Sequence, residues 1–104
     1  MKKTLSIAAL VALLVAAVPA SFGQAAADNY KTKCAMCHGA DGKGATPAGK
    51  TMGARDLTAG PAAKETDAEW TTITKNGKNK MPAYQGKLTD QQIGDLVKFM
   101  RTLK

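Results

Sequence analysis

The sequence predicts an all-α domain, because its clear structural signals are helix signals. Two segments, Thr66-Asp-Ala-Glu69 and Thr89-Asp-Gln-Gln92, read as capping boxes, in which the Thr hydroxyl and the Glu or Gln side chain satisfy backbone amides at a helix start. After the second box, apolar residues recur at the spacing of one helix face, namely Ile93, Leu96, Val97, Met100 and Leu103. No segment shows the alternation of a strand, and no repeat is present. We therefore expect helices joined by loops.

The first 20 residues have the layout of a secretory signal peptide. Two lysines at positions 2 and 3 precede residues 5–18, which are apolar except for Ser6. This run is short for a transmembrane helix, which needs about 20 residues, so an uncleaved anchor is the less favoured interpretation. We expect cleavage after Ala20, or as late as residue 27, so that the mature protein begins between Ser21 and Asp28. Its location would be the periplasm or an equivalent lumen.

The mature chain would form one small basic domain. Removal of the two N-terminal lysines lowers the net charge from +7 to about +5. The whole chain has only two Phe, two Tyr and one Trp, and a chain this short buries a limited core. We expect a covalent staple to supply the missing apolar area.

The first helix of this domain is predicted from about Ala25 to Met36, and it leads into Cys34-Ala-Met-Cys37-His38. Residues three and four apart share a helix face, so both thiols and the imidazole can point at one object. Two thiols at this spacing suit thioether bonds to haem, and the adjacent imidazole suits its iron, as in the C-x-x-C-H attachment motif.

Other interpretations of this motif explain less. A zinc site needs four ligands, but the chain has two Cys and one His in all. A structural disulfide leaves His38 unexplained. A thiol-disulfide redox protein using Cys34 and Cys37 remains the main alternative, although such a site needs a βαβ context that we do not find.

The middle of the chain is predicted to hold one further helix. The segment after His38 is rich in glycine, and residues 50–61 are expected to continue as a loop that contains Met52 and Arg55. The first capping box starts a helix over residues 67–76 that ends at Gly77 and buries Trp70 and Ile73.

Met81 lies in the irregular segment that follows, because Pro82 disfavours helix at the residue before it. Met36 falls in the attachment turn and Met100 on the buried stripe, so Met52 and Met81 are the candidates for a second iron ligand. Met81 is favoured because helix-forming segments on both sides would hold it. A thioether opposite His raises the haem potential, as electron carriers require.

With these residues together, the chain resembles the class I cytochromes c, over nearly all of the mature region. The resemblance implies a domain over residues 25–104, in which N- and C-terminal helices cross over a covalently bound haem, with one or more short middle helices and long loops. It implies that Cys34 and Cys37 hold one haem c and that His38 and Met81 bind its iron.

The resemblance extends to three residues outside the ligand set. Pro47 lies where the family has a proline whose carbonyl accepts the N–H of the iron-binding histidine. Tyr30 and Phe99 match the aromatic positions where the first and last helices of the family cross.

The expected function is one-electron transfer rather than catalysis. With both axial positions filled by protein, no iron site stays open for a substrate. If Met81 left the iron, the chain could act instead as a haem sensor or a weak peroxidase. Arg55, Trp70 and Tyr84 are candidate donors to the haem propionates.

The charge pattern predicts an acidic redox partner. Four lysines flank the Met81 segment, at positions 75, 78, 80 and 87, and a positive rim would speed encounter with an acidic protein. Nucleic acid is not an expected partner, because we expect the chain to be exported and find no nucleic-acid-binding motif in it. We expect a monomer without a membrane anchor once the signal peptide is removed.

Overall fold

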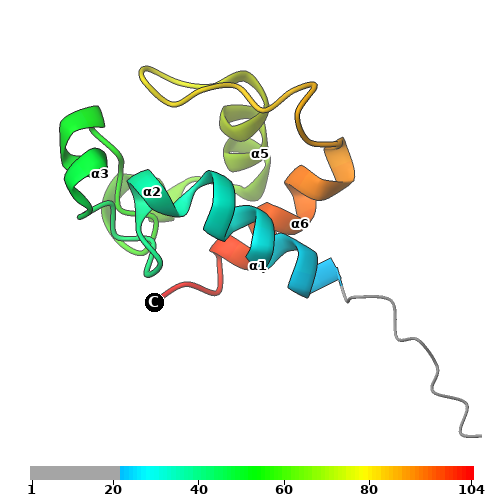
Figure 1. The fold of residues 1–104 in the computed structure, drawn as a ribbon, viewed down its shortest axis with the longest axis horizontal. Helices are drawn as coiled ribbons and strands as arrows, with labels where there is room; N and C mark the ends of the chain where they lie inside the picture. The colour runs from blue at the N-terminus through cyan, green and yellow to red at the C-terminus, as the bar shows by residue number, and fades with distance from the viewer. Residues whose placement is uncertain (1–21) are drawn as a thin grey trace, which may run out of the picture.

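The computed structural model describes residues 22–104, which form six helices and no strand (Figure 1). The all-α prediction is therefore confirmed for this part of the chain, while the predicted signal peptide lies outside it. None of these helices is long and apolar enough to cross a bilayer. The helices are α1 (Phe22–Lys33), α2 (Ala35–His38), α3 (Pro47–Met52), α4 (Gly60–Lys64), α5 (Asp67–Asn76) and α6 (Asp90–Met100).

The core lies where α1 and α5 each pack against α6. The rings of Tyr30 on α1 and Phe99 on α6 are 5.4 Å apart between centroids and tilted by 51°, an arrangement that aromatic pairs favour. This contact confirms that the first and last helices cross at these residues. The predicted apolar stripe of α6 is buried at Ile93, Leu96, Val97 and Met100.

The predicted first helix is present, but it begins earlier and breaks at Cys34. The chain turns there between α1 and α2, and the N–H of His38 donates to the carbonyl of Cys34 at 2.9 Å. The hydroxyl of Tyr30 donates to the carbonyl of Gly39 at 2.5 Å. This buried bond ties α1 to the residue that follows the attachment motif.

Both predicted capping segments start helices. The Thr89 hydroxyl accepts from the N–H of Gln92, and the Gln92 side chain accepts from Thr89 in return. At α5 only the Thr66 half of the box is formed. Helix α5 spans the predicted residues and buries Trp70, but Ile73 is only half-buried and not in the core as expected.

The prediction of a continuous loop over residues 50–61 is wrong, because α3 and α4 begin or end within it. Thr46 caps α3 by accepting from the N–H of Gly49, Pro47 occupies its first turn, and Gly53 ends it with φ of 71°. These are ordinary helix start and stop residues. Met52 is therefore the last residue of a helix and not a loop residue.

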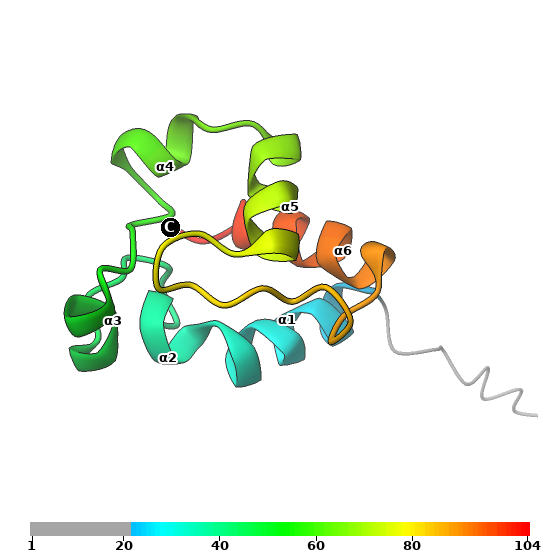
Figure 2. The same ribbon diagram turned by 90° about the horizontal axis from the view of Figure 1, so that it is seen from above.

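Residues 77–89, between α5 and α6, form a long loop that we call the Met81 excursion. This loop, coloured yellow to orange in Figure 2, passes α1 before it reaches α6. It leaves α5 at Gly77, whose φ of 78° is one that glycine adopts readily. The N–H of Tyr84 bonds back to the carbonyl of Thr74 at 3.0 Å, and the Tyr84 hydroxyl donates to the carbonyl of Lys33 at 2.9 Å. The excursion is thus fastened to α5 on one side and to α1 on the other.

Candidate functional site

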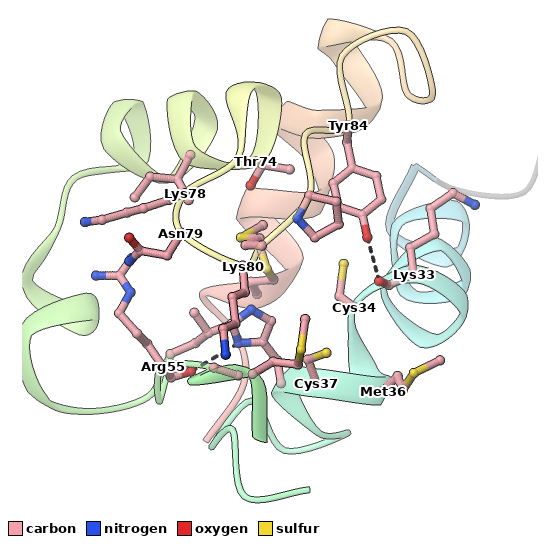
Figure 3. A pocket seen from close by; sticks show the side chains of 18 of the residues that line it. Lys33, Cys34, Met36, Cys37, Arg55, Thr74, Lys78, Asn79, Lys80 and Tyr84 are labelled. Carbon is pink, nitrogen blue, oxygen red and sulfur yellow. Dashed lines mark hydrogen bonds between the residues drawn. The ribbon is translucent and has the colours of Figure 1, made fainter. Parts of the chain in front are cut away.

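A cavity of about 350 Å³ lies between the α1–α2 segment, α5, α6 and the Met81 excursion (Figure 3). Its volume is in the range of small-molecule and cofactor sites. Leu57, Trp70, Leu96 and Met100 line it as core residues. It is therefore an apolar site with a few polar groups at its edge.

All four predicted haem-binding residues line this one cavity. Cys34, Cys37 and His38 come from the turn of α2, and Met81 comes from the excursion more than 40 residues later in the chain. Met52, the other candidate ligand, also lines the cavity, but 43% of its surface is exposed. The structure therefore brings the predicted set together and keeps both methionines at the site.

The surroundings of His38 select the tautomer of its ring. Burial lowers the pKa of the imidazole below its ordinary value, so the ring is neutral at pH 7. Its Nδ1 lies 3.1 Å from the carbonyl oxygen of Arg55, and a carbonyl only accepts, so Nδ1 carries the proton. Nε2 is then the free lone pair that a metal requires.

The expected role of Pro47 at His38 is wrong. Pro47 stands in the first turn of α3, and its carbonyl accepts from the hydroxyl of Thr51 at 3.1 Å. The acceptor for His38 comes from Arg55, in the segment that returns from α3 to α4. Sequence distance alone could not decide which carbonyl reaches the ring.

Comparison with known proteins identifies the family. The family profile described as "Cytochrome C oxidase, cbb3-type, subunit III" matches residues 22–100. The chain belongs to the small class I c-type cytochromes. Cytochrome c6 of Rippkaea orientalis is 38% identical over 96% of this chain and 92% of its own length. Cytochrome c6 of Thermosynechococcus vestitus is 35% identical over 95% and 89%.

Solved structures agree with this family. The KustC0563 c-type cytochrome matches with a TM-score of 0.69 and 30% identity over 76% of this chain and 96% of its own. Cytochrome c6 from the diatom Phaeodactylum tricornutum matches with a TM-score of 0.56 and 28% identity over 76% and 90%. The cytochrome is accordingly a haem electron carrier with covalently bound haem c and its iron.

The residues at the cavity fit this cofactor. Two thiols, a neutral imidazole and a thioether surround an apolar space, and these are the groups that c-type haem attachment and His/Met ligation use. Burial raises the pKa of the Cys34 thiol to about 11. A nucleophilic thiol needs the opposite shift and an accessible sulfur, so the buried Cys34 does not suit that role.

The candidate propionate donors are already engaged within the cytochrome. The indole N–H of Trp70 donates to the carbonyl of Ala62 at 2.8 Å, and the Tyr84 hydroxyl donates to the backbone carbonyl of Lys33. The Arg55 guanidinium pairs with the carboxylate of Glu65, but it has five N–H donors and uses two of them there. Arg55 is the one of the three with N–H donors left.

Helix α3 supports the attachment motif through contacts that were not predicted from the sequence. The Thr46 hydroxyl donates to the carbonyl of Met36 at 2.6 Å, and Gly49 is buried against the same turn. A Cβ at Gly49 would lie 2.1 Å from the carbonyl oxygen of Cys37. The Thr-Pro helix start was the signal for α3, but its close approach to Cys37 depends on packing alone.

We expect Gly49→Ala to destabilise the cytochrome by about 1–3 kcal/mol, the usual cost of overpacking. The added methyl group must push α3 away from the turn that carries both thiols. Denaturant unfolding of the holoprotein measures this loss. Gly94→Ala is the matched control, because a Cβ at Gly94 in α6 meets nothing within 4 Å and should stabilise the helix slightly. Equal effects of the two substitutions would contradict the packing role of Gly49.

Proposed function

We propose that this cytochrome is exported and carries single electrons between partner proteins in the periplasm or an equivalent lumen. In this proposal Cys34 and Cys37 hold the haem, and His38 and Met81 bind its iron. The observation that supports it is the gathering of these four side chains around one apolar cavity. When bound, the haem supplies a one-electron ferric/ferrous couple.

Met81 is the better candidate for the sixth ligand because the excursion holds it in place. Lys78 and Met81 exchange two backbone hydrogen bonds, of 3.2 and 2.9 Å, which close a tight turn. A Cβ at Gly77 would lie 2.7 Å from the Met81 carbonyl oxygen, so the turn packs closely on the end of α5. Met52 instead sits at the exposed end of a six-residue helix.

If His38 and Met81 both bind the iron, the protein would leave no iron position for a substrate. A site closed by two protein ligands changes little on reduction, which favours electron exchange over catalysis. We therefore infer that the chain is a carrier and not an enzyme.

The cavity rim is basic, which supports docking of an acidic partner. Lys33, Lys78 and Lys80 line the cavity (Figure 3). Of the four predicted rim lysines, Lys75 pairs with Asp90 at 3.1 Å, and Lys87 lies over the Tyr84 ring. We therefore assign the positive charge that would attract an acidic partner to Lys33, Lys78 and Lys80.

We expect electron exchange with an acidic partner to slow as ionic strength rises, since attraction between exposed charges is screened over about 8 Å at physiological salt. Stopped-flow rates measure this. Lys78→Gln with Lys80→Gln should lower the low-salt rate by about tenfold and flatten the salt dependence. The control is Lys98→Gln, on the exposed face of α6. Rates that do not depend on salt would contradict steering.

We further propose export with cleavage after Ala20. Helix α1 begins at Phe22, and Ala26 is 2% exposed, so cleavage after residue 27 would remove a core residue. N-terminal sequencing of the holoprotein from the periplasm should find Ser21 first. An intact Met1 on membrane-bound holoprotein would rule out this processing, and a start at Asp28 would rule out this site.

A further inference from the structure

The carbonyl that accepts from His38 belongs to Arg55, whose backbone is not fixed by a proline ring. Arg55 is no proline, so its φ is free to vary. Yet its oxygen must stay 3.1 Å from Nδ1 to keep the His38 ring oriented. A hydrogen bond at Nδ1 also makes the imidazole a more basic ligand. The N–H groups of Ala54 and Leu57 on either side bond to the carbonyls of Gly49 and Gly42, and a restraint on Arg55 itself would add to these bonds.

The side chain of Arg55 supplies that restraint through Glu65. Its Nη1 and Nη2 donate to the two carboxylate oxygens of Glu65 at 3.0 and 2.8 Å. Both side chains are partly shielded, with 36% and 19% of their surfaces exposed. A two-pronged pair of this kind fixes direction as well as distance.

Glu65 is itself held by Arg101, just past the end of α6. The Arg101 guanidinium donates to the backbone carbonyls of Glu65 and Ala63, the latter at 3.2 Å, and its Nε donates to Asp67 at 2.7 Å. It also stacks on Trp70, with 3.6 Å between its Cζ and the ring centroid. The segment before α5 is thus anchored to the core.

We propose that Glu65 and Arg101 are positioning residues that hold the Arg55 carbonyl on His38 and thereby lower the reduction potential of the bound haem. A continuous series of hydrogen bonds joins the C-cap of α6 to the imidazole: Arg101 to Glu65, Glu65 to Arg55, and Arg55 to His38. Loss of the restraint makes His38 a less basic ligand, which stabilises ferric iron less, so the potential rises. This inference rests on the proposed role of His38 as an iron ligand.

The first variant is Arg55→Met with Glu65→Met, which removes the restraint without changing the net charge. Because Arg55 also lines the cavity, Glu65→Asp, which keeps the Arg55 guanidinium, is measured beside it. We expect the potential of the holoprotein to rise, by about threefold or more in the equilibrium constant against a reference couple, the scale of one hydrogen bond. The Nδ1 proton of His38, followed by NMR, should also exchange faster with solvent. The matched control, Lys75→Met with Asp90→Met, removes the 3.1 Å ion pair and should change neither.

An unchanged potential together with unchanged Nδ1 proton exchange would overturn the proposal. If the double variant does not yield holoprotein, Glu65→Asp keeps the charge but shortens the side chain, and should shift both readouts in the same directions. Arg101→Lys, which cannot make all three bonds, should do so too, and no shift in either variant would again overturn it. The proposed ligand set is tested separately, by the ferric absorption spectrum of the parent protein. A parent spectrum without the features of His/Met ligation would show that the ligand set is wrong.

Discussion

Met81→Ala should open the sixth coordination position of the haem. Thioether sulfur is a soft ligand that favours ferrous iron, so its loss should lower the potential by more than about 59 mV, or tenfold in the equilibrium constant. The variant should bind carbon monoxide readily. It should also lose the weak long-wavelength band that the family resemblance leads us to expect of ferric His/Met haem. Ferric absorption spectra and redox titration measure these changes.

Met52→Ala is the matched control, because Met52 lines the same cavity from the end of α3. It should keep the long-wavelength band and nearly the parent potential. Loss of the band in Met52→Ala with survival in Met81→Ala would show that the ligand assignment is wrong. Loss in both variants would show that α3 and the Met81 excursion depend on each other for ligation.

Cys34→Ala combined with Cys37→Ala should abolish covalent haem attachment, because these are the only two thiols in the chain. Essentially all haem should then leave on extraction with acidified acetone, whereas the parent protein should retain it. His38→Ala should prevent stable holoprotein altogether, since the one imidazole in the chain would be lost. The apoprotein should be poorly folded, because the cofactor completes a small core.

The control for the double cysteine variant is Met36→Ala, inside the same motif. Met36 is 75% exposed, so its loss should leave attachment and folding unchanged. Haem that resists extraction from the double cysteine variant would contradict attachment through these thiols.

The local part of this protein could be predicted from the sequence alone. Cys34, Cys37 and His38 fall within one helical turn, and residues this close share a face wherever the helix lies. The caps at Thr66 and Thr89 act over three residues, so they place the starts of α5 and α6 without knowledge of the fold. Helix α3 carried an equally local signal in Thr46, Pro47 and Gly53, which the expectation of a loop overlooked.

Only the tertiary structure decided which distant groups meet. The acceptor for His38 is 17 residues along the chain at Arg55, and no periodicity selects one carbonyl among many at that range. The contact of Gly49 with Cys37 depends on how closely two short helices pack. Lys33 joined Lys78 and Lys80 at the cavity because α1 and the Met81 excursion fold onto each other. Sequence spacing fixes neighbours within a turn, whereas the burial of the whole core determines contacts between elements.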